Sequence, residues 1–275
     1  MRSLGGIISI AAASILISAC AAIAPAPQPS AELHPLEDRA ALVRQLTQKV
    51  AERDRALVSM QTDAVMEYSA PDSHPPKVRE EITAKRPDSL RVQAMSTPFS
   101  IALILATTGK RLAIFQPSEN KLIRAAATAD TLNQFIQIPM APADAVTLLL
   151  GIAPDSAALA NRTPDAIGDE GEMTVASWNA EKGVRRELGF QNDQLAMVRM
   201  REATGAVEYE VRYSEYQDLG GLMFPYTIEA NFPIAQSRAV FHYKRPIING
   251  DVPESTFVLA PTTASEQANL SNANH

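Results

Sequence analysis

Cysteine is almost absent from this chain, since Cys20 is the only one among 275 residues. A single thiol cannot form an intramolecular disulfide, so a folded domain must depend on a hydrophobic core for its stability. The sequence can supply that core, because 46% of its residues are hydrophobic. We therefore expect one large domain without disulfides.

Catalytic and metal-binding motifs are also missing. The sequence has no Gly-x-Ser-x-Gly, no second thiol for nucleophilic catalysis and no glycine-rich phosphate loop after a strand. Its four histidines do not stand at zinc-ligand spacing from other ligands: His34, His74, His242 and His275. These absences predict a protein that is not an enzyme, with no metal and no cofactor.

Paired carboxylates do not change this expectation. Adjacent residues on a strand face opposite sides, so Glu80-Glu81 and Asp169-Glu170 cannot converge on one bond. Glu208 and Glu210 share a face, but it is the outer one. We interpret both as exposed polar surface.

No cluster of lysine and arginine is present. The chain has 25 basic and 31 acidic residues and a net charge of −6, which becomes −7 without Arg2. Tracking a phosphate backbone requires a basic stripe. Nucleic acid is therefore excluded as an expected partner.

The first 19 residues have the pattern of a secretory signal peptide. Arg2 is followed by an apolar stretch from Leu4 to Ala19, and Ile17-Ser18-Ala19-Cys20 has the form of a lipobox. Small side chains admit the peptidase, and the thiol accepts diacylglycerol as a thioether. The alternative is a buried helix or a membrane span, for which the stretch is short against the ~20 residues needed. We expect a lipid anchor on Cys20.

The residues after Cys20 bear on location. Ala21 and Ala22 stand where an aspartate would, in enterobacteria, retain a lipoprotein at the inner membrane. Several acyl chains on one cysteine hold far more firmly than a single myristoyl group. The expected location is the periplasmic face of the outer membrane.

Composition divides the remainder into three parts. Residues 20–35 are rich in alanine and proline and predict a flexible tether. Residues 36–261 predict the folded domain, and residues 262–275, which lack periodicity, predict a disordered tail.

Apolar periodicity inside the domain predicts an α+β fold that is mainly antiparallel β. Residues 36–55, 130–136 and 142–150 have helical patterns, and 161–171 is a loop. About ten strands alternate with a period of two, at 58–68, 78–85, 90–95, 101–107, 111–115, 173–178, 184–190, 194–201, 207–213, 226–232 and 239–243. The turn at 107–110 should pair 101–106 with 111–115 as a hairpin. Twist curls such a sheet into a nearly closed barrel, with helices filling or covering its interior.

Two blocks of sequence resemble a known family. The first runs from Leu90 to Pro154 and contains Ser96-Thr97-Pro98-Phe99, Ala125-Ala126-Ala127-Thr128-Ala129-Asp130 and Leu149-Leu150-Gly151. The second contains Tyr213-Ser214-Glu215-Tyr216, Gly220, Phe224-Pro225, Ile248-Asn249 and Phe257-Val258-Leu259-Ala260-Pro261. Together they are similar to the LolB-like outer-membrane lipoproteins and to the closing strands of the LolA/LolB-like fold.

This resemblance implies a half-open, incomplete β-barrel with a helical lid, whose apolar interior receives acyl chains. In LolB-like receptors an apolar residue after a proline protrudes from a loop and touches membrane or cargo, and the matching position here is Phe99. The chain departs from the pattern by carrying Phe-Ser where Pro-Leu-Gly is usual, and by having only Trp178. The other interpretation of Phe99 is the first core residue of the next strand.

Apolar residues on the inner faces are candidates for lining a lipid cavity, because methionine and branched side chains adapt to flexible chains. They are Met60, Met66, Leu90, Val92, Ile114, Val146, Leu149, Tyr209, Val211, Ile228 and Phe241. A filled barrel core would use the same residues, so both interpretations stay open.

Two functional hypotheses follow. The first is a non-catalytic outer-membrane lipoprotein that binds acyl chains of lipids or lipoproteins, as a receptor in lipoprotein localisation with a periplasmic carrier protein as partner. The second is an envelope scaffold or assembly lipoprotein with a filled core that acts through its surface on a protein partner. The missing motifs argue against a third hypothesis, an envelope hydrolase.

Overall fold

One antiparallel sheet forms the framework of the domain. The computed structural model describes residues 36–71, 73, 75–97, 100–136 and 139–259, and thirteen strands lie within them. The strands are β1 (Ser59–Ser69), β2 (Val78–Lys85), β3 (Ser89–Thr97), β4 (Ser100–Thr108), β5 (Arg111–Gln116), β6 (Lys121–Ala126), β7 (Ala166–Glu170), β8 (Met173–Asn179), β9 (Arg185–Gln191), β10 (Gln194–Arg201), β11 (Val207–Asp218), β12 (Met223–Phe232) and β13 (Ser237–Ile248).

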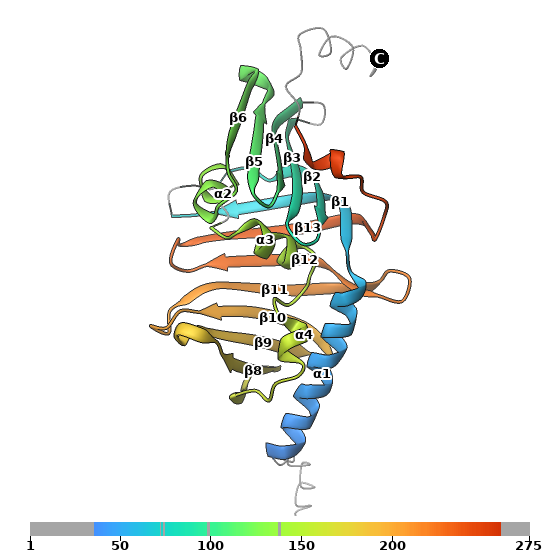
Figure 1. The fold of residues 1–275 in the computed structure, drawn as a ribbon, viewed down its shortest axis with the longest axis vertical. Helices are drawn as coiled ribbons and strands as arrows, with labels where there is room; N and C mark the ends of the chain where they lie inside the picture. Colours follow the sequence, from blue (N-terminus) through green and yellow to red (C-terminus); the bar gives the residue numbers. More distant parts are fainter. Residues whose placement is uncertain (1–35, 72, 74, 98–99, 137–138, 260–275) are drawn as a thin grey trace, which may run out of the picture. The chain divides into compact units, whose positions relative to one another are not determined.

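The strand order joins the two ends of the domain. It runs β6-β5-β4-β3-β2-β1-β13-β12-β11-β10-β9-β8-β7, so the first strand pairs with the last and every pairing is antiparallel (Figure 1). Strands β6 and β7 form the two edges and do not pair with each other. The sheet is therefore an incomplete barrel, in agreement with the expected fold class.

Two-residue alternation decides which side of each strand is buried. In β11, Tyr209, Val211 and Tyr213 are buried, whereas Glu208, just before them, and Arg212, between Val211 and Tyr213, are exposed. Apolar side chains on one face collect against the helices and polar ones remain in water. The predicted hairpin is also confirmed, because Leu105 of β4 pairs with Ile114 of β5.

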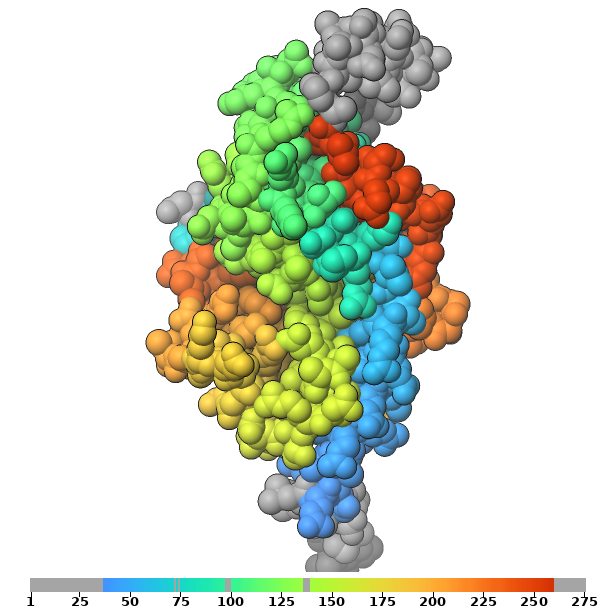
Figure 2. Space-filling view, in the orientation of Figure 1, coloured from blue at the N-terminus to red at the C-terminus, as the bar shows by residue number. Residues whose placement is uncertain are grey.

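Helices lie on the buried face of the sheet (Figure 1). The α-helices are α1 (Leu36–Ala56), α2 (Ala129–Ile136), α3 (Pro142–Leu149) and α4 (Ser156–Leu159), and short 3₁₀ turns are η1 (Pro117–Glu119), η2 (Glu181–Gly183) and η3 (Glu254–Phe257). Helix α1 buries Val43, Leu46 and Val50 in the core. It packs against α4, and Figure 2 shows the two segments side by side. Within the ranges described, no helix combines the length and the apolar character that crossing a bilayer requires.

Three elements differ from the sequence prediction. Strands β6 and β7 and helix α4 were not expected, and β7 occupies part of the predicted loop 161–171. Its sequence, Ala-Ile-Gly-Asp-Glu, has one large apolar residue and therefore no visible period. Pairing with β8, from Ala166 opposite Ser177 to Glu170 opposite Met173, makes it a strand.

A buried ion-pair cluster corrects the interpretation of Glu210 as exposed surface. The side chain of Arg199 is 6% exposed and donates to Glu210, Glu187 and Glu170 at 2.6, 2.8 and 2.8 Å. The side chain of Glu210 is only 16% exposed as a result. The hydrogen bond from Arg199 also lowers the pKa of Glu170. Sequence alternation assigned Glu210 to the outer face but did not indicate that Arg199, directly opposite it on the neighbouring strand β10, would cover it.

Candidate functional site

A cavity of about 200 Å³ lies between the sheet and helices α2 and α3. Its walls are formed by Met66, Tyr68, Pro75, Val78, Glu80, Ile82, Leu90, Val92, Ala94, Leu103, Phe135, Leu149, Ala239 and Phe241. For scale, an apolar cavity of ~150 Å³ holds benzene, and sites for drug-sized ligands begin near ~300 Å³. The space therefore suits a short length of one hydrocarbon chain.

Small residues on neighbouring strands explain why the sheet is hollow here. Glu80 of β2 lies opposite Ala64 of β1 on one side and Ala94 of β3 on the other. Ala239 of β13 lies opposite Tyr68 of β1. Ala94 and Ala239 lie on the cavity wall. Because an alanine fills much less volume than a leucine or phenylalanine, these two positions leave space that the helices above do not fill.

Glu80 is an acidic side chain on this otherwise apolar wall. It is 6% exposed, and burial raises its pKa to about 7. Within the described part of the chain, its carboxyl group forms no hydrogen bond or ion pair. The neighbouring Glu81 is exposed on the opposite face of β2.

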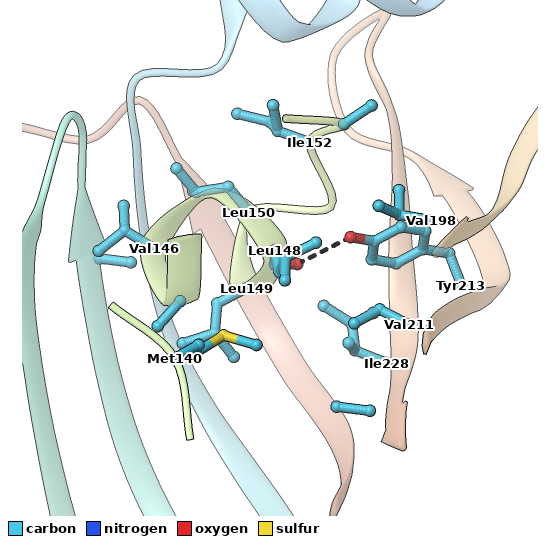
Figure 3. Close-up of a cluster of buried hydrophobic side chains, with 14 of the residues drawn as sticks. Met140, Val146, Leu148, Leu149, Leu150, Ile152, Val198, Val211, Tyr213 and Ile228 are labelled. Carbon is cyan, nitrogen blue, oxygen red and sulfur yellow. Dashed lines mark hydrogen bonds between the residues drawn. The ribbon is translucent and has the colours of Figure 1, made fainter. Parts of the chain in front are cut away.

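Helix α3 covers part of the cavity and is fixed at its carboxyl end. The hydroxyl of Tyr243 donates to the Leu149 carbonyl at 2.9 Å. That of Tyr213 donates to the Leu148 carbonyl at 3.3 Å, the bond drawn in Figure 3. These bonds satisfy carbonyls that a helix end leaves without an internal partner. Burial raises the pKa of both tyrosines, so both remain donors at neutral pH.

The chain immediately after α3 is held to α1. Arg53 donates to the Gly151 carbonyl, and Asp54 accepts from the backbone N–H of Ala153 at 3.1 Å. Gly151 has φ +69°, and a Cβ there would lie 2.6 Å from Cγ of Pro225. Only glycine fits this turn, and α3 is consequently anchored at a defined position.

Beyond α3, toward β10–β12, the interior is packed. Figure 3 shows Leu148, Val198, Val211 and Ile228 filling the space between the helix and the strands. A void of about 20 Å³ remains beside Met140. This is close to the smallest space that holds one water molecule, so it cannot receive a lipid chain.

The eleven predicted cavity residues do not all line the cavity. Five of them do: Met66, Leu90, Val92, Leu149 and Phe241. Val211 and Ile228 border only the small void, and Met60, Ile114, Val146 and Tyr209 are buried in the core away from both spaces. Phe99 and Cys20 lie outside the described residues, so the loop and the lipid anchor stay predictions.

Sequence reasoning did not single out Glu80 as a wall residue. The signal was present, because Val78, Glu80, Ile82 and Ala84 occupy one face of a strand with a two-residue period. An acid in the middle of that apolar face is the kind of position that marks a functional site.

Metal chemistry has no support in the described ranges, where no three His, Cys, Asp or Glu side chains come together as a metal site would require. His242 lies on the outer face of β13, as predicted, and its Nδ1 shares a hydrogen bond with Oγ1 of Thr227 at 3.1 Å. The hydrogen bond with Thr227 gives His242 a structural role on the sheet.

Comparison with known proteins identifies the fold. Neither a protein-family model nor a curated protein sequence matches the chain. A LolA superfamily protein from Nitrosomonas europaea superposes with a TM-score of 0.52 and 16% identity, covering 78% of this chain and 97% of that one. A DUF1329 family protein from Desulfovibrio piger gives 0.56 and 9%, covering 80% and 97%. A candidate outer-membrane lipoprotein-sorting protein domain from Vibrio parahaemolyticus gives 0.51 and 9%, covering 79% and 97%. The chain thus has the LolA/LolB-like fold, an incomplete and mainly antiparallel β-barrel with helices on its concave face.

Proposed function

We propose that this chain is a non-catalytic lipoprotein that binds acyl chains of lipids or lipidated proteins in the cavity under α2 and α3. The observation that carries the proposal is the cavity itself, about 200 Å³ in volume, with apolar side chains on nearly all of its wall. Each methylene transferred from water into such a space contributes ~0.8 kcal/mol. A short stretch of one chain therefore gains a few kcal/mol.

The proposal includes a place for the protein in the cell envelope. The lipobox residues Ile17-Ser18-Ala19-Cys20 support acylation of Cys20 and attachment to the periplasmic face of the outer membrane. Phe99 is the residue proposed to touch membrane or cargo. Acylated lipoproteins are the proposed cargo, and a periplasmic carrier protein is a proposed partner.

A specific observation favours a second candidate. Six of the eleven predicted cavity residues do not line the 200 Å³ cavity and are buried in the core or border only the small void. A mostly filled barrel is compatible with an envelope scaffold that acts on a protein partner through its surface. The size of the cavity still favours acyl binding, and the following experiment separates the two.

The test uses the unacylated full chain, carrying Cys20→Ser, and a fluorescent fatty-acyl probe. Ala94→Phe places a phenyl ring in the cavity, because Ala94 lies on its wall. Ala102→Phe is the matched control, since Ala102 is exposed on β4 beside the wall residue Leu103. Probe binding should be lost in Ala94→Phe and retained in Ala102→Phe.

Ala239→Leu provides a milder filling variant on another strand, in case Ala94→Phe is overpacked. Circular dichroism and thermal unfolding establish that each variant is folded. If the parent chain binds no acyl probe, or if filling the cavity leaves binding unchanged, the carrier function is wrong and the scaffold remains.

A further inference from the structure

Glu80 points into the cavity from the centre of β2. Its register partners, Ala64 and Ala94, have side chains too short to cover it. The carboxyl group is therefore on the cavity wall, although the residue as a whole is 6% exposed.

Among the described residues, none forms a hydrogen bond or an ion pair with this carboxyl group. The wall carries no lysine, arginine or histidine, and Tyr68 is its other titratable side chain. Tyr243 lies close enough to interact electrostatically with Glu80, but its hydroxyl donates to the Leu149 carbonyl. The fully buried polar atoms without a hydrogen-bond partner do not include the oxygens of Glu80, so these oxygens face the open space of the cavity. An apolar residue at position 80 would avoid the free energy that burial of a carboxyl group costs, and the missing protein partner therefore points to a ligand.

The chemistry of a carboxyl group in an apolar pocket restricts what that ligand can be. A carboxylate or phosphate beside Glu80 would bring two like charges together with little water to screen them. A hydroxyl, an amide N–H or an ammonium group would instead donate a hydrogen bond to Glu80. The rest of the wall is apolar and suits a hydrocarbon tail.

We propose that the cavity selects a single-chain amphiphile whose polar group donates a hydrogen bond to Glu80 and carries no negative charge. This inference rests on the proposed acyl-binding function and adds to it the class of headgroup. The tail lies against Leu90, Val92 and Phe241, and the polar group lies beside Ala94.

The test compares three probes with the same tail: decanol below its solubility limit, and decylammonium and decanoate below their micelle concentrations. Calorimetry on the unacylated full chain at about pH 8 should show decanol and decylammonium binding about tenfold or more tightly than decanoate. In Glu80→Gln the difference should disappear, because the amide N–H₂ donates to decanoate and no charge repels it. Glu81→Gln, on the exposed face of the same strand, should behave as the parent chain does.

Glu80→Met is a second variant, which removes both the charge and the hydrogen-bonding group. It should bind all three probes with similar affinity, by their tails alone. If the parent chain and Glu80→Gln rank the three probes alike, the headgroup inference is overturned while acyl binding stands. If the parent chain binds none of them, the proposed acyl-binding function is wrong, and this inference, which rests on it, is wrong too.

Discussion

The two sides of β13 fill the concave face of the sheet in different ways. Toward β8, large side chains such as Phe224 and Trp178 are 0% and 1% exposed, and a void of about 20 Å³ remains between α3 and strands β11 to β13. Toward β4, the strands carry Ala94 and the buried Glu80, and a cavity ten times as large remains. Both sides belong to one sheet with the same alternation. Side-chain volume at a few register positions, more than strand number, decides where the barrel is hollow.

Helices α3 and α2 also differ, in the contacts that hold each of them. The carboxyl end of α3 is bonded to Tyr213 and Tyr243, and the following residues are bonded to Arg53 and Asp54. Helix α2 contributes the buried Leu132 and the partly buried Phe135, which lies on the cavity wall. Helix α3 thus has polar anchors as well as apolar contacts.

Truncating one leucine in each region should give the largest effect. Leu188→Ala in β9 removes a side chain that is 1% exposed in the packed core, and should cost about 4 kcal/mol of unfolding free energy. Leu103→Ala in β4 should cost about 2 kcal/mol, because the lost side chain borders an existing void and has fewer neighbours. Urea denaturation measures both. Equal losses would mean that the two regions are packed alike.

Glu80 should make the hollow region sensitive to pH. Burial raises its folded-state pKa to about 7 from the ordinary glutamate value of 4.5, so the folded state binds more protons between these values. Stability is then greatest at low pH within this window and falls as pH rises to about 7, by about 3 kcal/mol in total. The difference in unfolding free energy between about pH 5 and about pH 8 should shrink by that amount in Glu80→Gln. An unchanged difference would mean that the carboxyl group is solvated or paired in the folded protein.

The smallest effect should come from two tyrosine hydroxyls. Tyr213→Phe leaves the buried Leu148 carbonyl without its donor and should cost about 1 to 2 kcal/mol. Tyr68→Phe on the cavity wall should change stability by less than about 0.5 kcal/mol, because its hydroxyl has no hydrogen-bond partner among the residues described. Thermal unfolding of the two variants gives the comparison. A Tyr68→Phe loss as large as that of Tyr213→Phe would contradict it.

The sequence predicted the alternating strands, the hairpin of β4 and β5 and the helices α1, α2 and α3, since each has a strong local period. The sequence did not predict the edge strands β6 and β7, because they become strands by pairing with a neighbouring strand and not through a local period. Local pattern also does not show which apolar residues line a cavity, because the cavity depends on Glu80, Ala94 and Ala239, which come from three different strands. Periodicity indicates which side of a strand is inward, but it does not measure the volume between distant strands.

The two unpaired edges of the sheet have a consequence for self-association. An exposed strand edge is a template on which another chain can add a strand and begin a fibre. Here β7 is only five residues long, with Asp169 bound to Arg39 and Glu170 bound to Arg199, and β6 carries Lys121 and Arg124. A second chain that added a strand to either edge would have to place its own side chains beside these charges. The short, charged edges therefore disfavour polymerisation although the barrel is open.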